Sequence, residues 1–119
     1  IGSYGAPANP TNHLVYNNTI YGNANYGLRI NADSSGTIVT NNIMVGNGTD
    51  YSDAGNGTLS SNNRTTNAGM VDPANGNFQL NSTSLARDTG TTLSTVATDC
   101  TGVARPQGAA YDIGAYEFV

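Results

Sequence analysis

The chain has 119 residues, of which only 10% are charged, and four arginines face eight acidic residues, which gives a net charge of −4. This length fits one domain. Scattered arginines on an acidic chain exclude a nucleic-acid surface, which needs clustered Lys and Arg, and no apolar run reaches the roughly 18 residues of a membrane span. The abundance of Asn, Gly, Ser and Thr, together with seven Tyr, favours many short strands joined by tight turns.

Residues 1–13 carry several Gly and Pro residues without a clear period and are interpreted as an irregular lead-in. The sequence starts at Ile1 rather than at Met, which is the pattern of a processed product or of an excised fragment. Both explanations stay open.

A repeat begins directly after the lead-in. The stretch 14–23 (LVYNNTIYGN) returns 24 residues later as 38–47 (IVTNNIMVGN), and a shorter copy, LSSNN, occupies 59–63. Each unit reads as strand, Asn-Asn corner, strand and Gly-Asn turn, and a further extended run follows at 26–30 and at 49–52. A period of this size is typical of solenoids, propellers and arrays.

Three short runs per unit predict an all-β right-handed parallel β-helix of about three to five coils with an irregular C-terminal capping segment. The predicted divisions are the lead-in at 1–13, coils at 14–66, and a C-terminal coil with a capping tail at 67–119. A propeller blade needs about 40 residues, and sandwich strands do not repeat an Asn-Asn corner, so both are less favoured. The predicted inward residues are Val15, Ile20, Leu28, Val39, Ile43 and Leu59, and the predicted amide ladder is Asn18, Asn42 and Asn63.

The tail contains a series of blocks at 71–73, 76–80, 84–90, 99–106 and 112–119, and it ends in Asp-Ile-Gly-Ala-Tyr-Glu with Arg-Pro shortly before. In this order the blocks resemble the C-terminal region of secreted or surface-attached bacterial proteins of the pectate-lyase-like right-handed parallel β-helix superfamily. The chain departs from that pattern at Leu85, where the family has Pro, and at Arg87, where it has an apolar residue. The resemblance implies an extracellular or cell-surface location and a carbohydrate-rich environment, but fold alone does not select an activity.

Lyases of the resembled superfamily pair a base with acidic residues, and the corresponding candidates in this chain are Arg29, Asp33, Asp50 and Asp53. Arginine is a poor general base, so a salt bridge on the outer surface is the favoured interpretation of Arg29 with these acids. Asp50 and Asp53 are also the candidates for a Ca²⁺ site, since carboxylate and carbonyl oxygens suit that ion. No other cofactor is expected.

Several further residues have structural interpretations. One guanidinium can hold two chain segments together, so Arg105 with Asp112 and Glu117 is predicted to be a structural clamp. Cys100, the single cysteine, is expected to be a buried thiol, with an intermolecular disulfide as the alternative. Asn-x-Ser/Thr triplets occur at about the frequency expected by chance and give five candidate glycosylation sites: Asn17, Asn47, Asn56, Asn63 and Asn81.

Two functions follow as hypotheses. The first is an extracellular structural or surface protein without catalytic activity, which self-assembles end to end into filaments, because an open strand edge is a template for another chain. Its partners would be copies of itself, and polysaccharide or the cell surface. The alternative is the C-terminal part of a polysaccharide lyase or glycoside hydrolase whose catalytic coils lie upstream.

Overall fold

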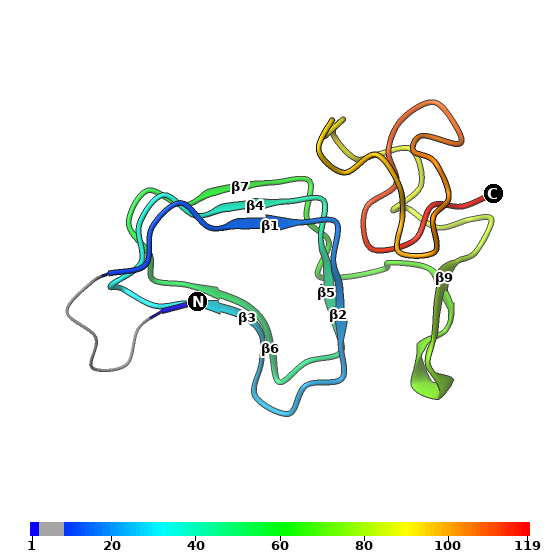
Figure 1. The fold of residues 1–119 in the computed structure, drawn as a ribbon. Helices are drawn as coiled ribbons and strands as arrows, with labels where there is room; N and C mark the ends of the chain where they lie inside the picture. The colour runs from blue at the N-terminus through cyan, green and yellow to red at the C-terminus, as the bar shows by residue number, and fades with distance from the viewer. Residues whose placement is uncertain (3–8) are drawn as a thin grey trace.

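The computed structural model describes residues 1–2 and 9–119, which form nine short strands and one 3-10 helix (Figure 1). No α-helix occurs in this part of the chain, as its low content of helix-forming residues predicts. The elements are β1 (Leu14–Tyr16), β2 (Thr19–Tyr21), β3 (Tyr26–Ile30), β4 (Ile38–Thr40), β5 (Ile43–Val45), β6 (Thr49–Asp53), β7 (Leu59–Ser61), β8 (Met70–Asp72), η1 (Pro73–Asn75) and β9 (Asn77–Leu80).

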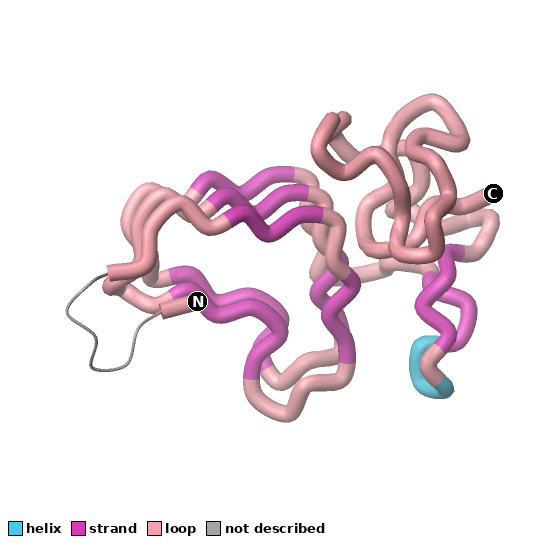
Figure 2. The backbone as a smooth tube through the Cα atoms, in the orientation of Figure 1, coloured by secondary structure: helices cyan, strands magenta, loops and turns pink. Residues whose placement is uncertain are grey.

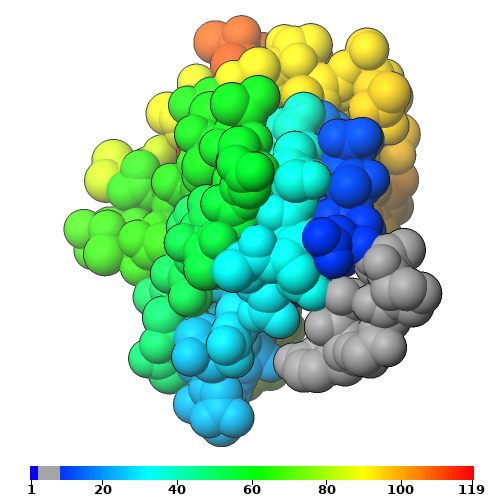
Figure 3. Space-filling model, turned by 90° about the vertical axis from the view of Figure 1, so that its left-hand side faces the viewer, coloured from blue at the N-terminus to red at the C-terminus, as the bar shows by residue number. Residues whose placement is uncertain are grey.

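The repeated units lie on one another so that equivalent strands pair in parallel (Figure 2). One sheet has the order β1-β4-β7, and two further sheets each contain one pair, β2-β5 and β3-β6. The register follows the repeat, since Leu14 pairs with Ile38 and Ile38 with Leu59. We call residues 11–64 the strand stack, because the bridges Thr11–Ser35–Asn56 and Ile43–Arg64 extend it beyond the strands. Figure 3 shows its successive tiers side by side in blue, cyan and green.

The first Asn of each Asn-Asn pair makes the corner between adjacent strands. Asn17, Asn41 and Asn62 have φ values of 48°, 61° and 51°, in the left-handed region. Asparagine adopts this conformation more readily than most residues, which is why it recurs at this position.

Two apolar clusters stabilise the fold. Inside the strand stack, Leu28, Ile30, Val39 and Met44 are buried, and the last three are 0–1% exposed. Each such side chain contributes roughly 1.5–3 kcal/mol by its removal from water. The second cluster joins the stack to the tail and consists of Ile43, Ala68, Leu80, Ala86 and Ile113.

The prediction of a right-handed parallel β-helix of three to five coils is wrong. The described residues form a small all-β structure in which short strands make several small separate sheets, and these do not close into a solenoid. The physical reason is that the third repeat is incomplete. Its strand β7 has Ser60 where Val15 and Val39 stand, and residues 62–67 are polar and form no strand, so that no further apolar layer can be buried.

The predicted capping position of the tail is also wrong. Residues 67–119 lie beside the strand stack rather than over one of its ends, and they contain an antiparallel pair, β8-β9, followed by loops (Figure 1). Most hydrogen bonds that join the tail to the stack reach the Asn corners, such as those from Asn17 Nδ2 to the carbonyl oxygen atoms of Asp112 and Gly114, and one more runs from the Ala115 N–H to Thr19 Oγ1 in β2.

Four of the six predicted inward residues contact the interior of the stack: Val15, Ile20, Leu28 and Val39. Ile43 is fully buried, but against the tail, because Met44 occupies the inward position opposite Ile20. Leu59 is 64% exposed, so its predicted burial is wrong. A shift of one residue in a strand changes the face of every side chain, which explains both errors.

Candidate functional site

A column of amide side chains runs through the strand stack along the second Asn of each pair. The main-chain N–H and the side-chain Nδ2 of Asn18 both donate to Asn42 Oδ1, at 2.9 and 3.0 Å. The same two groups of Asn42 donate to Asn63 Oδ1, each at 2.9 Å. Asn18, Asn42 and Asn63, the residues named from the sequence as a ladder, therefore lie in one continuous hydrogen-bonded column.

This first column is open at both ends. Among the described residues, no group donates to Asn18 Oδ1 and none accepts from the Asn63 N–H. Asn18 is exposed, whereas Asn42 in the middle of the column is 0% exposed. One end of the column thus offers an acceptor and the other end offers a donor.

A second column, which sequence reasoning did not identify, is closed at one end. Asn23 N–H and Nδ2 donate to Asn47 Oδ1 at 2.9 Å, in the manner of the first column. The N–H and Nδ2 of Asn47 then donate to Asp50 Oδ1, at 2.9 and 3.0 Å, within the same repeat unit. Asp50 is therefore a terminator of this column.

The sheet β1-β4-β7 has two outer edges, and no described strand pairs with either of them. Both edges carry an exposed leucine from the same register position, Leu14 at 60% and Leu59 at 64% exposure. Neither outer strand contains a charged residue or proline, which are common devices that prevent edge pairing. We call the edges of β1 and β7, with Asn18 and Asn63 beside them, the outer edges; they are the candidate functional site.

The corner asparagines form a third set, which anchors the tail. Asn41 Oδ1 accepts from the Thr91 N–H at 2.9 Å, its Nδ2 donates to the Thr91 carbonyl at 2.7 Å, and its own carbonyl accepts from the Gly114 N–H at 2.8 Å. Asn62 Nδ2 bonds Thr91 Oγ1. The sequence shows two adjacent Asn residues at each corner, but only the strand register determines which one faces the tail.

The predicted clamp is buried, with a geometry that differs in part from the expected one. Arg105 Nη1 lies 2.9 Å from Glu117 Oε2, with both side chains 1% exposed. The guanidinium also donates to the carbonyl oxygen atoms of Asp112, at 3.1 Å, and Gly114, at 2.9 Å. The Asp112 carboxylate accepts instead from the main-chain N–H groups of Asp88 and Phe118. Arg105 therefore holds one carboxylate and two carbonyl groups.

The two departures from the resembled tail pattern have different surroundings. The guanidinium carbon of Arg87 lies 3.9 Å from the centroid of the Phe118 ring, a cation–π contact. Leu85 is 57% exposed. Cys100 is exposed as well, so the expectation of a buried thiol is wrong.

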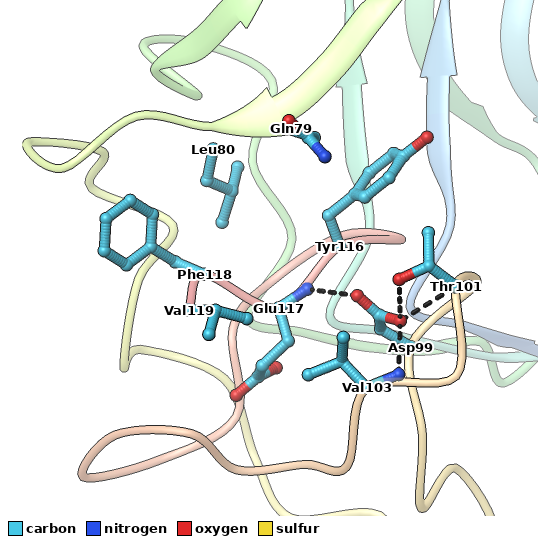
Figure 4. A pocket seen from close by; sticks show the side chains of 9 residues that line it. All are labelled: Gln79, Leu80, Asp99, Thr101, Val103, Tyr116, Glu117, Phe118 and Val119. Atoms are coloured by element: carbon cyan, nitrogen blue, oxygen red, sulfur yellow. Dashed lines mark hydrogen bonds between the residues drawn. The ribbon is translucent and has the colours of Figure 1, made fainter.

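A pocket of about 220 Å³ lies at the end of the tail, between β9 and the final loop (Figure 4). Its polar wall is the Asp99 carboxylate, whose Oδ1 accepts from Thr101 and Val103 and whose Oδ2 accepts from the Glu117 N–H at 3.0 Å. The carboxylate thus closes its own turn, 99–103, and joins it to the final segment at Glu117. The lining residues are Gln79, Leu80, Asp99, Thr101, Val103, Tyr116, Glu117, Phe118 and Val119.

Two of the three buried carboxyl groups of the tail, Asp99 and Glu117, have pKa values shifted in opposite directions. Burial raises the pKa of Asp99, but the hydrogen bonds from Glu117, Thr101 and Val103 outweigh burial, so the net pKa lies below the ordinary value of 3.8. Burial raises the pKa of Glu117 above the ordinary value of 4.5, and hydrogen bonds from the main chain and the Arg105 charge offset this only in part.

We expect Asp99→Asn to weaken the loss of stability in acid. Because the pKa of Asp99 is lower in the folded state, the unfolded state binds the proton first, and the stabilisation present above pH 3.8 is lost as the pH falls through the folded-state value. Urea unfolding at a series of pH values between 7 and 2.5 measures this. Glu117→Gln is the comparison with the opposite sign, since its raised pKa makes the protein less stable as the pH rises above 4.5. If the free energy of unfolding falls equally steeply with decreasing pH in the wild type and in Asp99→Asn, the lowered pKa of Asp99 is contradicted.

The candidate catalytic residues do not form a common site in the described part of the chain. Arg29 is exposed and its guanidinium carbon lies 4.8 Å from the centroid of the Tyr26 ring, with no ion pair to Asp50 or Asp53. Asp50 terminates the second column, and Asp53 Oδ1 accepts from Gly55 N–H and Thr58 Oγ1 in its own loop. Asp33 lies in the turn after β3.

The described residues include no group of three or more His, Cys, Asp or Glu side chains that could hold a metal ion, so Ca²⁺ binding at Asp50 and Asp53 remains a prediction. Within the same residues, no helix has the length and apolar character needed to cross a bilayer.

Of the five candidate glycosylation sites, Asn17 is buried against the tail, and Asn47 and Asn63 belong to the amide columns. Asn81 Oδ1 accepts from Thr83. Asn56 is the only exposed member of the five, so it is the most accessible acceptor.

Comparisons with known proteins give no family: no family model, no curated protein and no solved structure matches the chain.

Proposed function

We propose that this chain is a structural protein without catalytic activity of its own, which associates with other chains through its outer edges. The observation that carries the proposal is the pair of exposed edges at β1 and β7, each with a solvent-exposed leucine and an unused amide group beside it. An unpaired strand edge is a template for a further strand, and β-strand addition is a common mode of recognition.

The length of the edge strands sets the expected strength of association. Each outer strand has three residues, so one edge contributes few hydrogen bonds, each worth about 0.5–1.5 kcal/mol net. Association should therefore be reversible and strongly dependent on protein concentration.

The alternative, an enzyme acting on polysaccharide, receives less support from the described residues. Glycoside hydrolysis uses two carboxylates that face each other across a cleft. Asp50 and Asp53 instead accept hydrogen bonds within their own turns, and Asp99 joins its own turn to the final segment of the tail.

Sedimentation velocity over a wide range of protein concentrations, followed by electron microscopy, tests the proposal. We expect the wild type to form larger species as the concentration rises and Leu59→Lys to remain monomeric, because a charge at the β7 edge opposes pairing. Leu85→Lys is the matched control, since Leu85 has a similar exposure of 57% but lies in the tail, and it should associate like the wild type. A reducing agent prevents disulfide dimers through the exposed Cys100. A wild type that stays monomeric at every concentration would contradict the proposal.

The extracellular or cell-surface location expected from the resemblance is part of the same proposal, and polysaccharide binding stays a prediction. Fractionation of the producing cells tests the location, which recovery from the cell interior alone would contradict.

A further inference from the structure

We infer that the partner is a second copy of this chain bound head to tail, with the β7 edge of one copy against the β1 edge of the next. The inference rests on the proposed function and gives it an orientation. Contacts of this kind repeat without closing and produce open filaments, whereas a two-fold contact ends at a dimer.

The first support is the direction of the amide column. Every link runs from the N–H and Nδ2 of one Asn to Oδ1 of the Asn in the next strand, from Asn18 through Asn42 to Asn63. The unused group is an acceptor, Asn18 Oδ1, at the β1 edge and a donor, the Asn63 N–H, at the β7 edge. Donor meets acceptor only when unlike edges join, since two β1 edges would bring acceptor against acceptor.

The second support is the pairing geometry. All strand pairs of the stack are parallel, in the register Leu14–Ile38–Leu59. A further parallel strand in this register would be β1 of another copy, with its Leu14 beside Leu59. Edges related by a two-fold axis would have to pair antiparallel, unlike every other pair of the stack.

The third support is the stepped shape of the two ends. At one end β7 projects one strand layer beyond β6. The third repeat forms a counterpart of β1 and β4, but among the described residues it forms no counterpart of β3 and β6. At the other end Ile1 lies beside β3, where it accepts from the Asn31 N–H at 2.8 Å and donates to the Arg29 carbonyl. In a head-to-tail contact, β1 of the second copy pairs with β7 of the first. Ile1 of the second copy then lies next to β6 of the first, at the position that no described strand of the third repeat occupies. The two steps are thus complementary in shape.

Asp50 explains why the contact is centred on the outer edges. It accepts from both donors of Asn47, so the second column offers no free donor at the β6 side. The first column is the one that a second copy can continue.

A charge-swap experiment tests the orientation. Leu14→Lys and Leu59→Glu are both at exposed positions, and each should weaken association alone. The double variant Leu14→Lys/Leu59→Glu should recover it, because opposite charges then meet across the contact between copies. The matched control Leu14→Lys/Leu59→Lys places like charges there, and we expect its association constant to be about tenfold lower than that of the swapped variant at low salt.

The outcomes separate the orientation from the proposed function. If the wild type associates but the swapped double variant stays as weak as the control, and a mixture of Leu14→Lys with Leu14→Glu recovers association instead, the contact is two-fold and the inference is wrong. If the wild type does not associate at all, the proposed function itself fails. Circular dichroism of each variant verifies that the chain is folded.

Discussion

Arg105→Ala is expected to lower the free energy of unfolding by about 3–5 kcal/mol, since it removes one partner of a buried ion pair. The guanidinium bonds the Glu117 carboxylate and the carbonyl groups of Asp112 and Gly114, and both charged side chains are 1% exposed. Its loss leaves Glu117 charged and buried without a cation, and leaves two carbonyl groups without this donor. Urea unfolding at pH 7 followed by circular dichroism measures the change.

Arg105→Lys is the comparison for this prediction. Lysine keeps the charge but presents a single ammonium in place of a planar fork, so that it cannot bond all three acceptors in the same geometry, and we expect an intermediate loss. Glu117→Gln leaves the buried Arg105 guanidinium without its counter-ion, but the carbonyl groups of Asp112 and Gly114 still accept from it, so we expect a smaller loss than for Arg105→Ala. A loss below 1 kcal/mol for Arg105→Ala would mean that water reaches the pair.

Asn42→Ala has the second large expected effect, a loss of about 3 kcal/mol, because it leaves one buried and several partly buried hydrogen bonds unmade. The Asn42 Nδ2 group donates to Val15 O at 2.8 Å, to Thr40 O at 3.1 Å and to Asn63 Oδ1 at 2.9 Å, and its Oδ1 accepts from Asn18. The side chain is 0% exposed, so water cannot replace these bonds without a change in packing. Thermal and urea unfolding both report the loss.

Asn23→Ala is the control for the column argument. Asn23 is exposed at the end of the second column, where water can take over its bonds to Asn47, and we expect a loss below about 1 kcal/mol. Similar losses for Asn23→Ala and Asn42→Ala would show that burial does not set the strength of these columns.

The repeat correctly indicates which strands lie next to each other, but it overestimates how many layers of strands are stacked. The spacing of 14–23 and 38–47 indicates which strands lie next to each other, and Asn18, Asn42 and Asn63 are found in one column. The number of layers was overestimated, because β7 resembles β1 and β4 in its Asn-Asn corner but has Ser60 in place of an inward valine. A corner motif thus reports a turn, whereas only apolar inward residues can support a further layer.

The sequence also does not determine which residues of a strand face the interior. In 43–45 (IMV), all three residues are apolar, so alternation cannot tell whether Ile43 or Met44 faces the interior of the stack. Contact with the tail decides it, since Ile43 packs against Ala86 and Ile113. In the same way, the adjacent Asn41 and Asn42 are identical in type, so the sequence does not indicate that Asn41 is the one that anchors the tail.

The tail could be interpreted only in part. The sequence indicated that Arg105 holds separate segments, and Glu117 is its ion-pair partner. The role of Asp112 differs from the predicted one, because its carboxylate accepts from the N–H groups of Asp88 and Phe118. These partners depend on the path of the loops, which leaves no periodic pattern in the sequence. The position of the tail beside the stack depends on the corner asparagines, whose outward direction follows from the three-dimensional register.

Amide hydrogen exchange of Asn63, compared with Asn42 at low and high protein concentration, tests the central claim most directly. The Asn42 N–H is bonded within the chain at 2.9 Å, so it should be protected at both concentrations. The Asn63 N–H, which has no acceptor among the described residues, should exchange rapidly in dilute protein and become protected as copies associate. Rapid exchange of Asn63 at concentrations where association is complete would contradict the claim that the outer edges join the copies.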